Sequence, residues 1–186
     1  MEILLKGFEN EGPVNDWKIK CLVLENTDIN FIRDLARLRE IEIVHGDVTK
    51  KETLRNAIKD ADVVFHIAGV IHPKKISDLY QVNTIGTLNL ISEAFYAGVK
   101  RFIYISSNSV GGTNLKRHIL MRENDAPRPY MNYGLSKYQA ESLVNSFQET
   151  GKIETVILRP CWFYGPNQPN RQTKFFNMIE KRNPIV

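Results

Sequence analysis

Short apolar runs alternate with longer amphipathic stretches along most of the chain. The apolar runs are nearly continuous in Val, Ile, Leu and Phe, which is typical of parallel strands covered on both faces. Strands that alternate with helices indicate βαβ units, so the predicted fold class is α/β with a doubly wound parallel sheet. The six predicted strands cover residues 1–5, 19–24, 42–45, 62–67, 101–106 and 154–158.

Helical spacing of apolar residues occurs between these strands. Asp28 is a candidate N-cap, and Thr49 with Glu52 forms a capping-box pattern at the start of a second helix. Gly98 and Gly151 are natural stops for two longer helices. The predicted helices cover residues 28–39, 50–59, 78–96, 133–150 and 173–181.

Two segments interrupt the alternation. Residues 108–132 form a long connection rich in Gly, Asn, Pro and charge, and loops longer than about 12–15 residues are usually functional or disordered. Residues 6–17, between the first two predicted strands, are too few for an ordinary crossover helix. We therefore expect the first βα unit to be incomplete.

Tyr133 and Lys137 form the sharpest chemical pattern. A spacing of four on a helix places both on one face, one turn apart. A neighbouring ammonium favours the phenolate and lowers the pKa of a tyrosine from its usual value near 10. Tyr133 could then take a proton from a substrate hydroxyl while hydride leaves the same carbon. Ser107 follows a predicted strand, where ligands of open α/β sheets bind, and would hold the substrate oxygen.

These residues lie in segments that resemble a known family. Tyr133-Gly-Leu-Ser-Lys137-x-x-Ala-Glu141 is similar to the catalytic helix of extended short-chain dehydrogenase/reductases, the NAD-dependent sugar-nucleotide epimerases and dehydratases. Further similar motifs follow in the family's order, within a match from about Lys18 to Pro184. They are His45-Gly46-Asp47-Val48, His66-Ile-Ala-Gly69, Val82-Asn83-Thr-x-Gly86-Thr87-x-Asn89-Leu90, Phe102-Ile-Tyr-Ile-Ser-Ser107 and Arg159-Pro160-x-x-x-Tyr164-Gly165-Pro166.

The resemblance implies a Rossmann-like fold, a catalytic set and a cofactor. The implied catalytic residues are Ser107, Tyr133, Lys137 and the supporting Asn83. The implied cofactor-binding residues are Glu25, Asp47, Val48, His66, Ala68, Gly69, Tyr133, Lys137 and Pro160.

NAD is the expected cofactor, in preference to NADP. Glu25 ends a predicted strand, where a carboxylate can accept hydrogen bonds from ribose hydroxyls and would repel a 2′-phosphate. Gly69 has no Cβ and would allow a close approach of the backbone to the cofactor.

The sequence departs from the family at both ends. The family's Gly-x-x-Gly-x-x-Gly turn binds the cofactor pyrophosphate, but residues 6–12 have two glycines five apart and the carboxylates of Glu9 and Glu11. These carboxylates would oppose an anion. We expect one partial dinucleotide-binding domain over residues 1–186, in which residues 167–186 only begin the substrate lobe.

Composition adds few constraints. Of the 186 residues, 42% are hydrophobic and 25% charged, as in soluble globular proteins. The net charge of +4 comes from scattered basic residues, which argues against nucleic acid and favours an anionic substrate or cofactor. Cys21, Cys161 and the four histidines show no disulfide or metal-ligand spacing, so no metal is expected. No signal or membrane segment is recognised, which predicts a cytoplasmic protein.

The sequence therefore predicts an NAD-dependent epimerase/dehydratase-type oxidoreductase acting on a nucleotide-sugar-like alcohol. A hydroxysteroid-type dehydrogenase remains open, because the Tyr-x-x-Ser-Lys helix does not separate the two. The missing glycine turn motivates another alternative, a non-catalytic remnant or fragment that serves as an interaction module. The family resemblance also implies a homodimer through the helices predicted at 78–96 and 133–150.

Overall fold

The computed structural model describes residues 18–36, 41–114, 116, 118–161, 164–165, 168 and 170–182. All strand pairs among them are parallel, which confirms the predicted α/β class. The predicted strand at 1–5 and the segment 6–17 lie outside the described residues. The strands are β1 Ile19–Val23, β2 Ile41–His45, β3 Val63–His66, β4 Arg101–Ile105 and β5 Glu154–Leu158.

The described helices follow the predicted positions with shifted ends. The α-helices are α2 Asn30–Ala36, α3 Arg55–Ile58, α4 Ile76–Leu79, α5 Gly86–Tyr96, α6 Met131–Gln148 and α7 Asn170–Glu180. Short 3-10 helices cover Lys51–Thr53 and Asn108–Val110, and a π-helical segment, Tyr80–Ile85, joins α4 to α5. The single predicted helix at 78–96 is therefore a composite of three segments.

The predicted cap at Thr49 is wrong. The Thr49 hydroxyl and backbone N–H both donate to the Asp47 carboxylate at 2.8 Å, so Thr49 closes a turn instead of starting a helix. The stops at the two longer helices are confirmed. Gly98 and Gly151 follow α5 and α6 with φ of 77° and 68°, a region that suits glycine.

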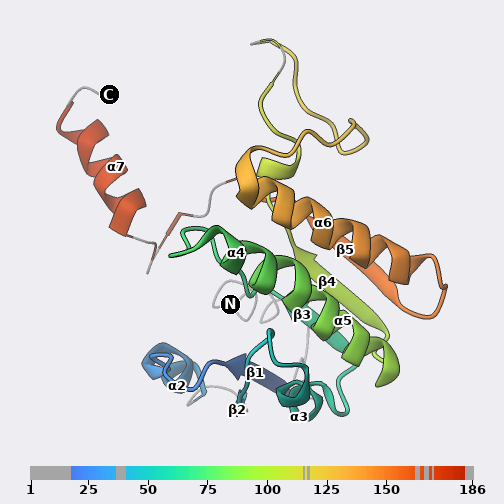
Figure 1. Ribbon diagram of the computed structural model, residues 1–186. Helices are drawn as coiled ribbons and strands as arrows, with labels where there is room; N and C mark the ends of the chain where they lie inside the picture. Colours follow the sequence, from blue (N-terminus) through green and yellow to red (C-terminus); the bar gives the residue numbers. More distant parts are fainter. Residues whose placement is uncertain are drawn as a thin grey trace, which may run out of the picture.

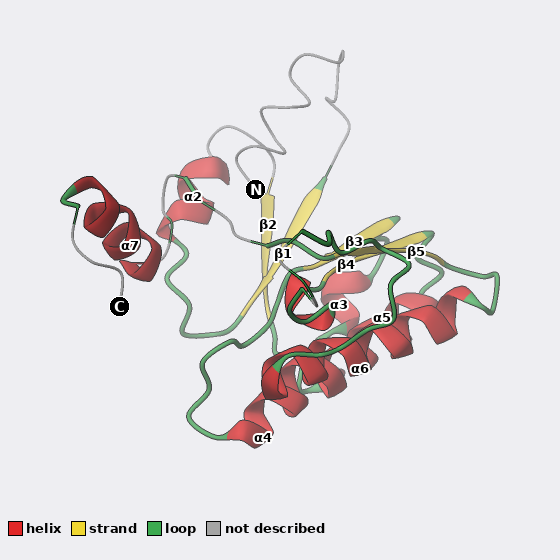
Figure 2. Cartoon of the chain, turned by 90° about the horizontal axis from the view of Figure 1, so that it is seen from above, coloured by secondary structure: helices red, strands yellow, loops and turns green. Residues whose placement is uncertain are grey.

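The strands form a β1–β2 pair and a three-stranded sheet in the order β3-β4-β5. Helices α5 and α6 lie side by side across one face of the three-stranded sheet (Figures 1 and 2). Both belong to crossovers that step in the same direction, and right-handed connections then place them on the same face. The opposite face exposes Phe65, Ile67 and Leu158. Among the described residues, this face of the three-stranded sheet is thus exposed at these positions, whereas α5 and α6 cover the other face.

The core lies between the sheet and these helices. Phe102 and Tyr104 of β4 are fully buried against Ile91 of α5 and Val144 of α6. The remaining buried members of the cluster are Val48, Leu54, Ile58, Leu90, Ala94, Val99, Ala140 and Ile153. This packing fixes the end of β4 relative to α6.

The long connection predicted at 108–132 begins with the short 3-10 helix and then projects beyond α6 (Figure 1). Its two ends are held together by backbone hydrogen bonds. The Arg128 N–H donates to the Val110 carbonyl at 3.0 Å, and the Tyr130 N–H donates to the Ser109 carbonyl at 2.8 Å. The start of α6 is thereby fixed beside the end of β4.

Candidate active site

Lys137 reaches from α6 to the carboxyl end of β4. Its ammonium donates a hydrogen bond to the Ile105 carbonyl at 2.7 Å, and the residue is only 3% exposed. Burial lowers the pKa of Lys137 to about 8, while the Glu141 carboxylate acts in the opposite direction. An amine with this pKa is still mainly protonated at neutral pH, but it loses its proton more readily than an ordinary lysine.

Ser107 lies just beyond the same strand end. It is buried, and its hydroxyl oxygen accepts a hydrogen bond from the Ser109 N–H at 3.1 Å. The next residue, Asn108, donates its N–H to the Pro160 carbonyl at 3.1 Å. These contacts bring Ser107, Pro160 and Lys137 to one edge of the sheet.

Tyr133 lies in the first turn of α6, one turn before Lys137, and is half-buried. This turn packs tightly on the segment that follows Ser107. A Cβ on Gly134 would lie 2.6 Å from the Ser109 carbonyl oxygen, closer than real contacts allow. Glycine at position 134 therefore permits the close approach of the first turn of α6 to the backbone of Ser109.

Asn83 supports the site through the backbone beyond β3. It lies in the π-helical segment and is fully buried. Its amide donates to the Val70 carbonyl at 2.9 Å, and its carbonyl oxygen accepts from the Val70 N–H at 2.8 Å. The amide also donates to the Ser136 hydroxyl at 3.0 Å. π-Helical turns are frequent at functional sites, and this one aims Asn83 between two site segments.

The turn after β3 carries Ala68 and Gly69, both exposed. A Cβ on Gly69 would lie 3.2 Å from the Asn83 side-chain oxygen and 3.8 Å from the Lys137 ammonium nitrogen. The absent Cβ therefore leaves open the space beside these two side chains. His66, by contrast, is buried at the end of β3 and bonds to the Thr87 hydroxyl at 2.8 Å. A role of the His66 side chain in touching a cofactor stays a prediction.

A second feature lies at the carboxyl ends of β1 and β2. A cleft of about 470 Å³ is lined by residues that include Glu25, His45, Asp47 and Lys50. The Glu25 carboxylate is largely exposed and lies 3.6 Å from the His45 ring nitrogen. Two of the predicted cofactor residues, Glu25 and Asp47, thus line the same cleft.

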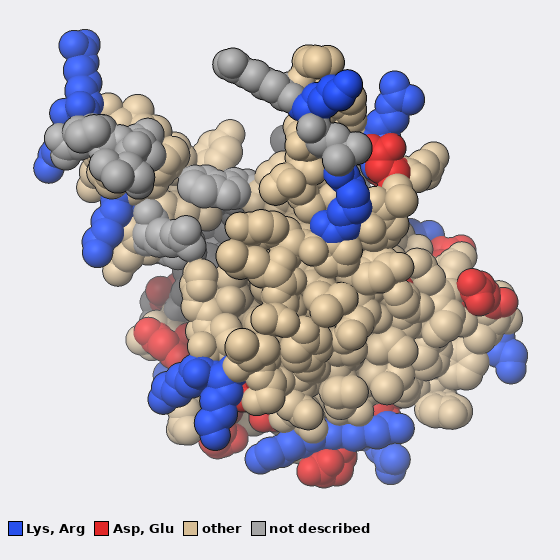
Figure 3. Space-filling model, turned by 45° about the horizontal axis from the view of Figure 1, so that its top comes forward, with Lys and Arg blue, Asp and Glu red and all other residues tan. Residues whose placement is uncertain are grey.

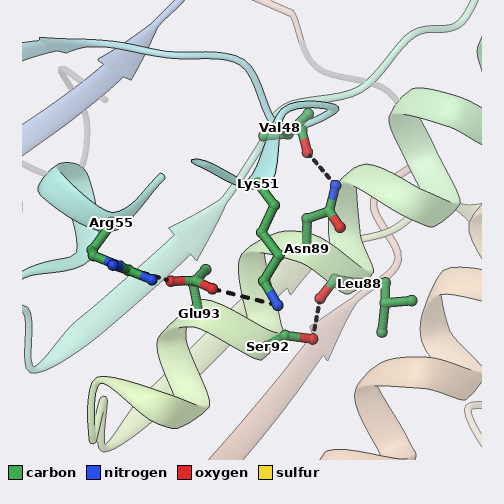
Figure 4. Close-up of polar contacts among 7 residues, drawn as sticks. All are labelled: Val48, Lys51, Arg55, Leu88, Asn89, Ser92 and Glu93. Atoms are coloured by element: carbon green, nitrogen blue, oxygen red, sulfur yellow. Dashed lines mark hydrogen bonds and ion pairs between the residues drawn. The ribbon is translucent and has the colours of Figure 1, made fainter. Parts of the chain in front are cut away.

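The turn that carries Asp47 is tied to α5 (Figure 4). The Asn89 amide donates to the Val48 carbonyl at 3.0 Å. Next to it, Glu93 forms ion pairs with Lys51 at 3.4 Å and Arg55 at 3.8 Å. Helix α5 therefore holds one wall of the cleft.

The sequence interpretation missed two parts of the site. The Ser136 hydroxyl donates to the Tyr133 carbonyl at 2.8 Å and links that turn to Asn83. The buried Glu141 carboxylate accepts two hydrogen bonds from Arg159, at 2.9 and 2.7 Å. Glu141 and Arg159 both belong to the motifs quoted in the sequence analysis, and Glu141 lies four residues after Lys137. That spacing was the available signal.

Comparison with known proteins now places the chain. The family model described as "NAD dependent epimerase/dehydratase family" matches residues 19–183. The chain belongs to the NAD-dependent epimerase/dehydratase family. This confirms the resemblance stated from the motifs.

Relatives of this epimerase/dehydratase chain include an uncharacterised protein of Sinorhizobium fredii, 37% identical over 98% of this chain and 52% of the relative. The UDP-glucose 4-epimerase of Vibrio cholerae is 33% identical over 75% of this chain and 44% of the relative. A solved short-chain dehydrogenase/reductase superfamily protein from Agrobacterium tumefaciens, with bound NAD, is 28% identical. It covers 77% of this chain and 48% of that protein, with a TM-score of 0.64. The chain thus spans about half the length of these relatives.

The described residues fit the cofactor that this family uses. Glu25 places an exposed carboxylate in the cleft, where it can accept hydrogen bonds from a ribose. At the other end of the site, Gly69 leaves open the space beside Lys137. Residues 6–12, which stand where the family has its pyrophosphate turn, lie outside the described residues.

The described residues contain no group of three or more His, Cys, Asp or Glu side chains that could hold a metal ion. No helix among them is long and apolar enough to cross a membrane.

Proposed function

We propose that this chain is the cofactor-binding and catalytic part of an NAD-dependent epimerase or dehydratase acting on a nucleotide-sugar alcohol. The observation that carries the proposal is the hydrogen bond from the buried Lys137 ammonium to the carbonyl of Ile105 at the end of β4. Ile105 lies two residues before Ser107, and Lys137 lies one helical turn after Tyr133. In this arrangement Tyr133 would transfer the proton, Lys137 would supply the positive charge beside it, and Ser107 would donate a hydrogen bond, all near the carboxyl end of β4.

In the proposed mechanism, Tyr133 takes the proton of a substrate hydroxyl. Lys137 lies one turn away on the same helix and would supply a positive charge next to the reacting oxygens. Ser107 holds the substrate oxygen by a hydrogen bond, which fixes the carbon that loses hydride. A bound NAD supplies the hydride acceptor and, in the reverse direction, the donor. Asn83 would support the site indirectly, because its side chain holds the Val70 backbone by two hydrogen bonds.

The cleft beside β1 and β2 is assigned to the adenosine end of the cofactor. Glu25 would accept hydrogen bonds from the ribose hydroxyls and would repel a 2′-phosphate, which favours NAD over NADP. Asp47 and Val48 would line the adenine on a turn that Asn89 holds from α5. The predicted contributions of His66, Ala68, Gly69 and Pro160 concern the nicotinamide end.

The substrate class rests on the relatives. Similarity to a UDP-glucose 4-epimerase supports a nucleotide-sugar, and the net charge of +4 is compatible with an anionic substrate. Turnover is tested by incubating the chain with UDP-glucose and NAD and following epimerised or dehydrated sugar by chromatography. We expect turnover by the wild type, loss of turnover in Tyr133→Phe and retention in the matched control Tyr138→Phe on the same helix.

The outcomes separate the alternatives. Full activity of Tyr133→Phe would contradict the assigned mechanism. Oxidation of a 3β-hydroxysteroid without action on sugar nucleotides would favour the hydroxysteroid-type dehydrogenase. Binding of NAD by a folded chain that turns over neither substrate would support a non-catalytic interaction module.

A second copy of the chain is the proposed protein partner. In α6, the charged residues are Lys137 and Glu141, and both are buried, so the outer side of this helix carries no charge. On the face seen in Figure 3, Lys, Arg, Asp and Glu gather mainly near the rim. Such a face suits self-association through α5 and α6. Light scattering should give the mass of a dimer; a monomer mass at all concentrations tested would contradict this proposal.

A further inference from the structure

The Lys137 ammonium has an unusual second neighbour. Its nitrogen lies 4.3 Å from the centroid of the Tyr104 ring, within the range of a cation–π interaction. The hydrogen bond to Ile105 satisfies one of the three donors of the ammonium. A buried charge requires compensation, and the negative face of an aromatic ring supplies it without carrying a charge.

The Tyr104 ring is held rigidly in this position. It projects from the central strand β4 and is 0% exposed. The His66 ring stacks on it, with centroids 5.5 Å apart and an interplanar angle of 30°. His66 is in turn bonded to the Thr87 hydroxyl of α5. The ring therefore presents its face to Lys137 without freedom to turn away.

The other groups around Lys137 do not replace this contact. From β3, His66 has a pKa lowered to about 3, mainly by burial and also by the Lys137 charge, so it is neutral near pH 7. From α6, the Glu141 carboxylate is already engaged by two hydrogen bonds from Arg159, which follows β5. Tyr133, also on α6, is the group that Lys137 is assigned to tune.

We propose that Tyr104 is a positioning residue whose ring face holds the Lys137 ammonium at the end of β4. The inference deepens the function proposed above, because it rests on the assignment of Lys137 as the charge that tunes Tyr133. Tyr104 acts through Lys137 and reaches neither substrate nor cofactor. The part of Tyr104 that contacts the Lys137 ammonium is the face of its ring, so the ring and not the hydroxyl carries the proposed role.

The test measures the titration of Lys137 itself and needs neither cofactor nor turnover. The rate of acetylation of Lys137 is followed against pH by peptide mass spectrometry in the folded 186-residue chain. In Tyr104→Leu, the loss of the ring should lower the titration midpoint by about one pH unit. Tyr104→Phe keeps the ring and should leave the midpoint unchanged.

Phe102→Leu is the matched control. Phe102 is a fully buried ring two residues earlier on the same strand, so its loss disturbs the core to a similar degree. The midpoint of Lys137 should stay at its wild-type value in this variant. Equal midpoints in Tyr104→Leu and Phe102→Leu would overturn the proposal.

A second substitution keeps the test decisive if Tyr104→Leu does not fold. Pentafluorophenylalanine at position 104 nearly preserves the shape of the ring but reverses its quadrupole, so the Lys137 midpoint should fall. An unchanged midpoint would overturn the proposal. Neither result depends on NAD binding, so the proposed function and this inference can fail separately.

Discussion

The buried pair of Glu141 and Arg159 allows a prediction of its energetic contribution. Glu141 is 2% exposed and accepts hydrogen bonds at 2.9 and 2.7 Å, whereas the Arg159 side chain is 29% exposed. Removal of one partner from a buried pair destabilises a protein by about 3–5 kcal/mol, because the other charge remains unpaired. Water can still reach part of Arg159, so Glu141→Leu should lower the free energy of unfolding by about 3 kcal/mol, at the lower end of that range.

The assay is urea unfolding followed by circular dichroism, with a double-mutant cycle. Arg159→Met is the second single variant, and the double variant removes both charges. Because no charge is then left unpaired, the double variant should be more stable than Glu141→Leu alone. Glu149→Leu, an exposed position at the end of α6, is the control and should change stability by less than about 0.5 kcal/mol.

Two results would contradict this prediction. If Glu141→Leu unfolds with the stability of the control, the pair does not hold α6 to the segment after β5. If the losses in the two single variants simply add in the double variant, the two side chains are not coupled. A further consequence concerns Lys137: because the Glu141 carboxylate raises its pKa, Glu141→Leu should move that pKa below about 8.

Three further predictions concern the same framework. Asn89→Ala removes the hydrogen bond to the buried Val48 and should reduce stability by about 1–2 kcal/mol in urea unfolding. Gly134→Ala places a Cβ 2.6 Å from the Ser109 carbonyl oxygen and should reduce stability by about 1–3 kcal/mol, measured by thermal unfolding. Because the pKa of Lys137 is lowered on folding, from 10.5 to about 8, the unfolded state binds more protons between these values. Its contribution to stability should therefore rise with pH over this window, and Lys137→Met should abolish the rise.

The sequence predicted the parallel strands well because they are short runs rich in Val, Ile, Leu and Phe, and such runs also occur in β3 and β5, where alternate residues are exposed. The strand expected at 154–158 has those bounds in β5, and the one expected at 42–45 starts one residue earlier in β2. The division of the helix expected at 78–96 into three segments was not predicted. A π-helical segment inserts there without breaking the apolar spacing, so periodicity alone does not reveal it.

Part of the candidate site followed from local spacing. The relation of Tyr133 to Lys137 is a property of one helix, and the position of Ser107 is a property of one strand end. The contact of Lys137 with Tyr104 depends on how α6 packs against β4, which spacing along the chain does not specify. The stacking of the buried His66 ring on Tyr104 depends on packing in the same way, and a role of His66 in lining a cofactor stays a prediction.

The central claim is that this chain binds NAD, and calorimetric titration of NAD into the purified 186-residue chain tests it most directly. We expect saturable binding with one NAD per chain and weaker binding of NADP, because Glu25 would repel a 2′-phosphate. Absence of NAD binding by a chain that circular dichroism shows to be folded would contradict the account.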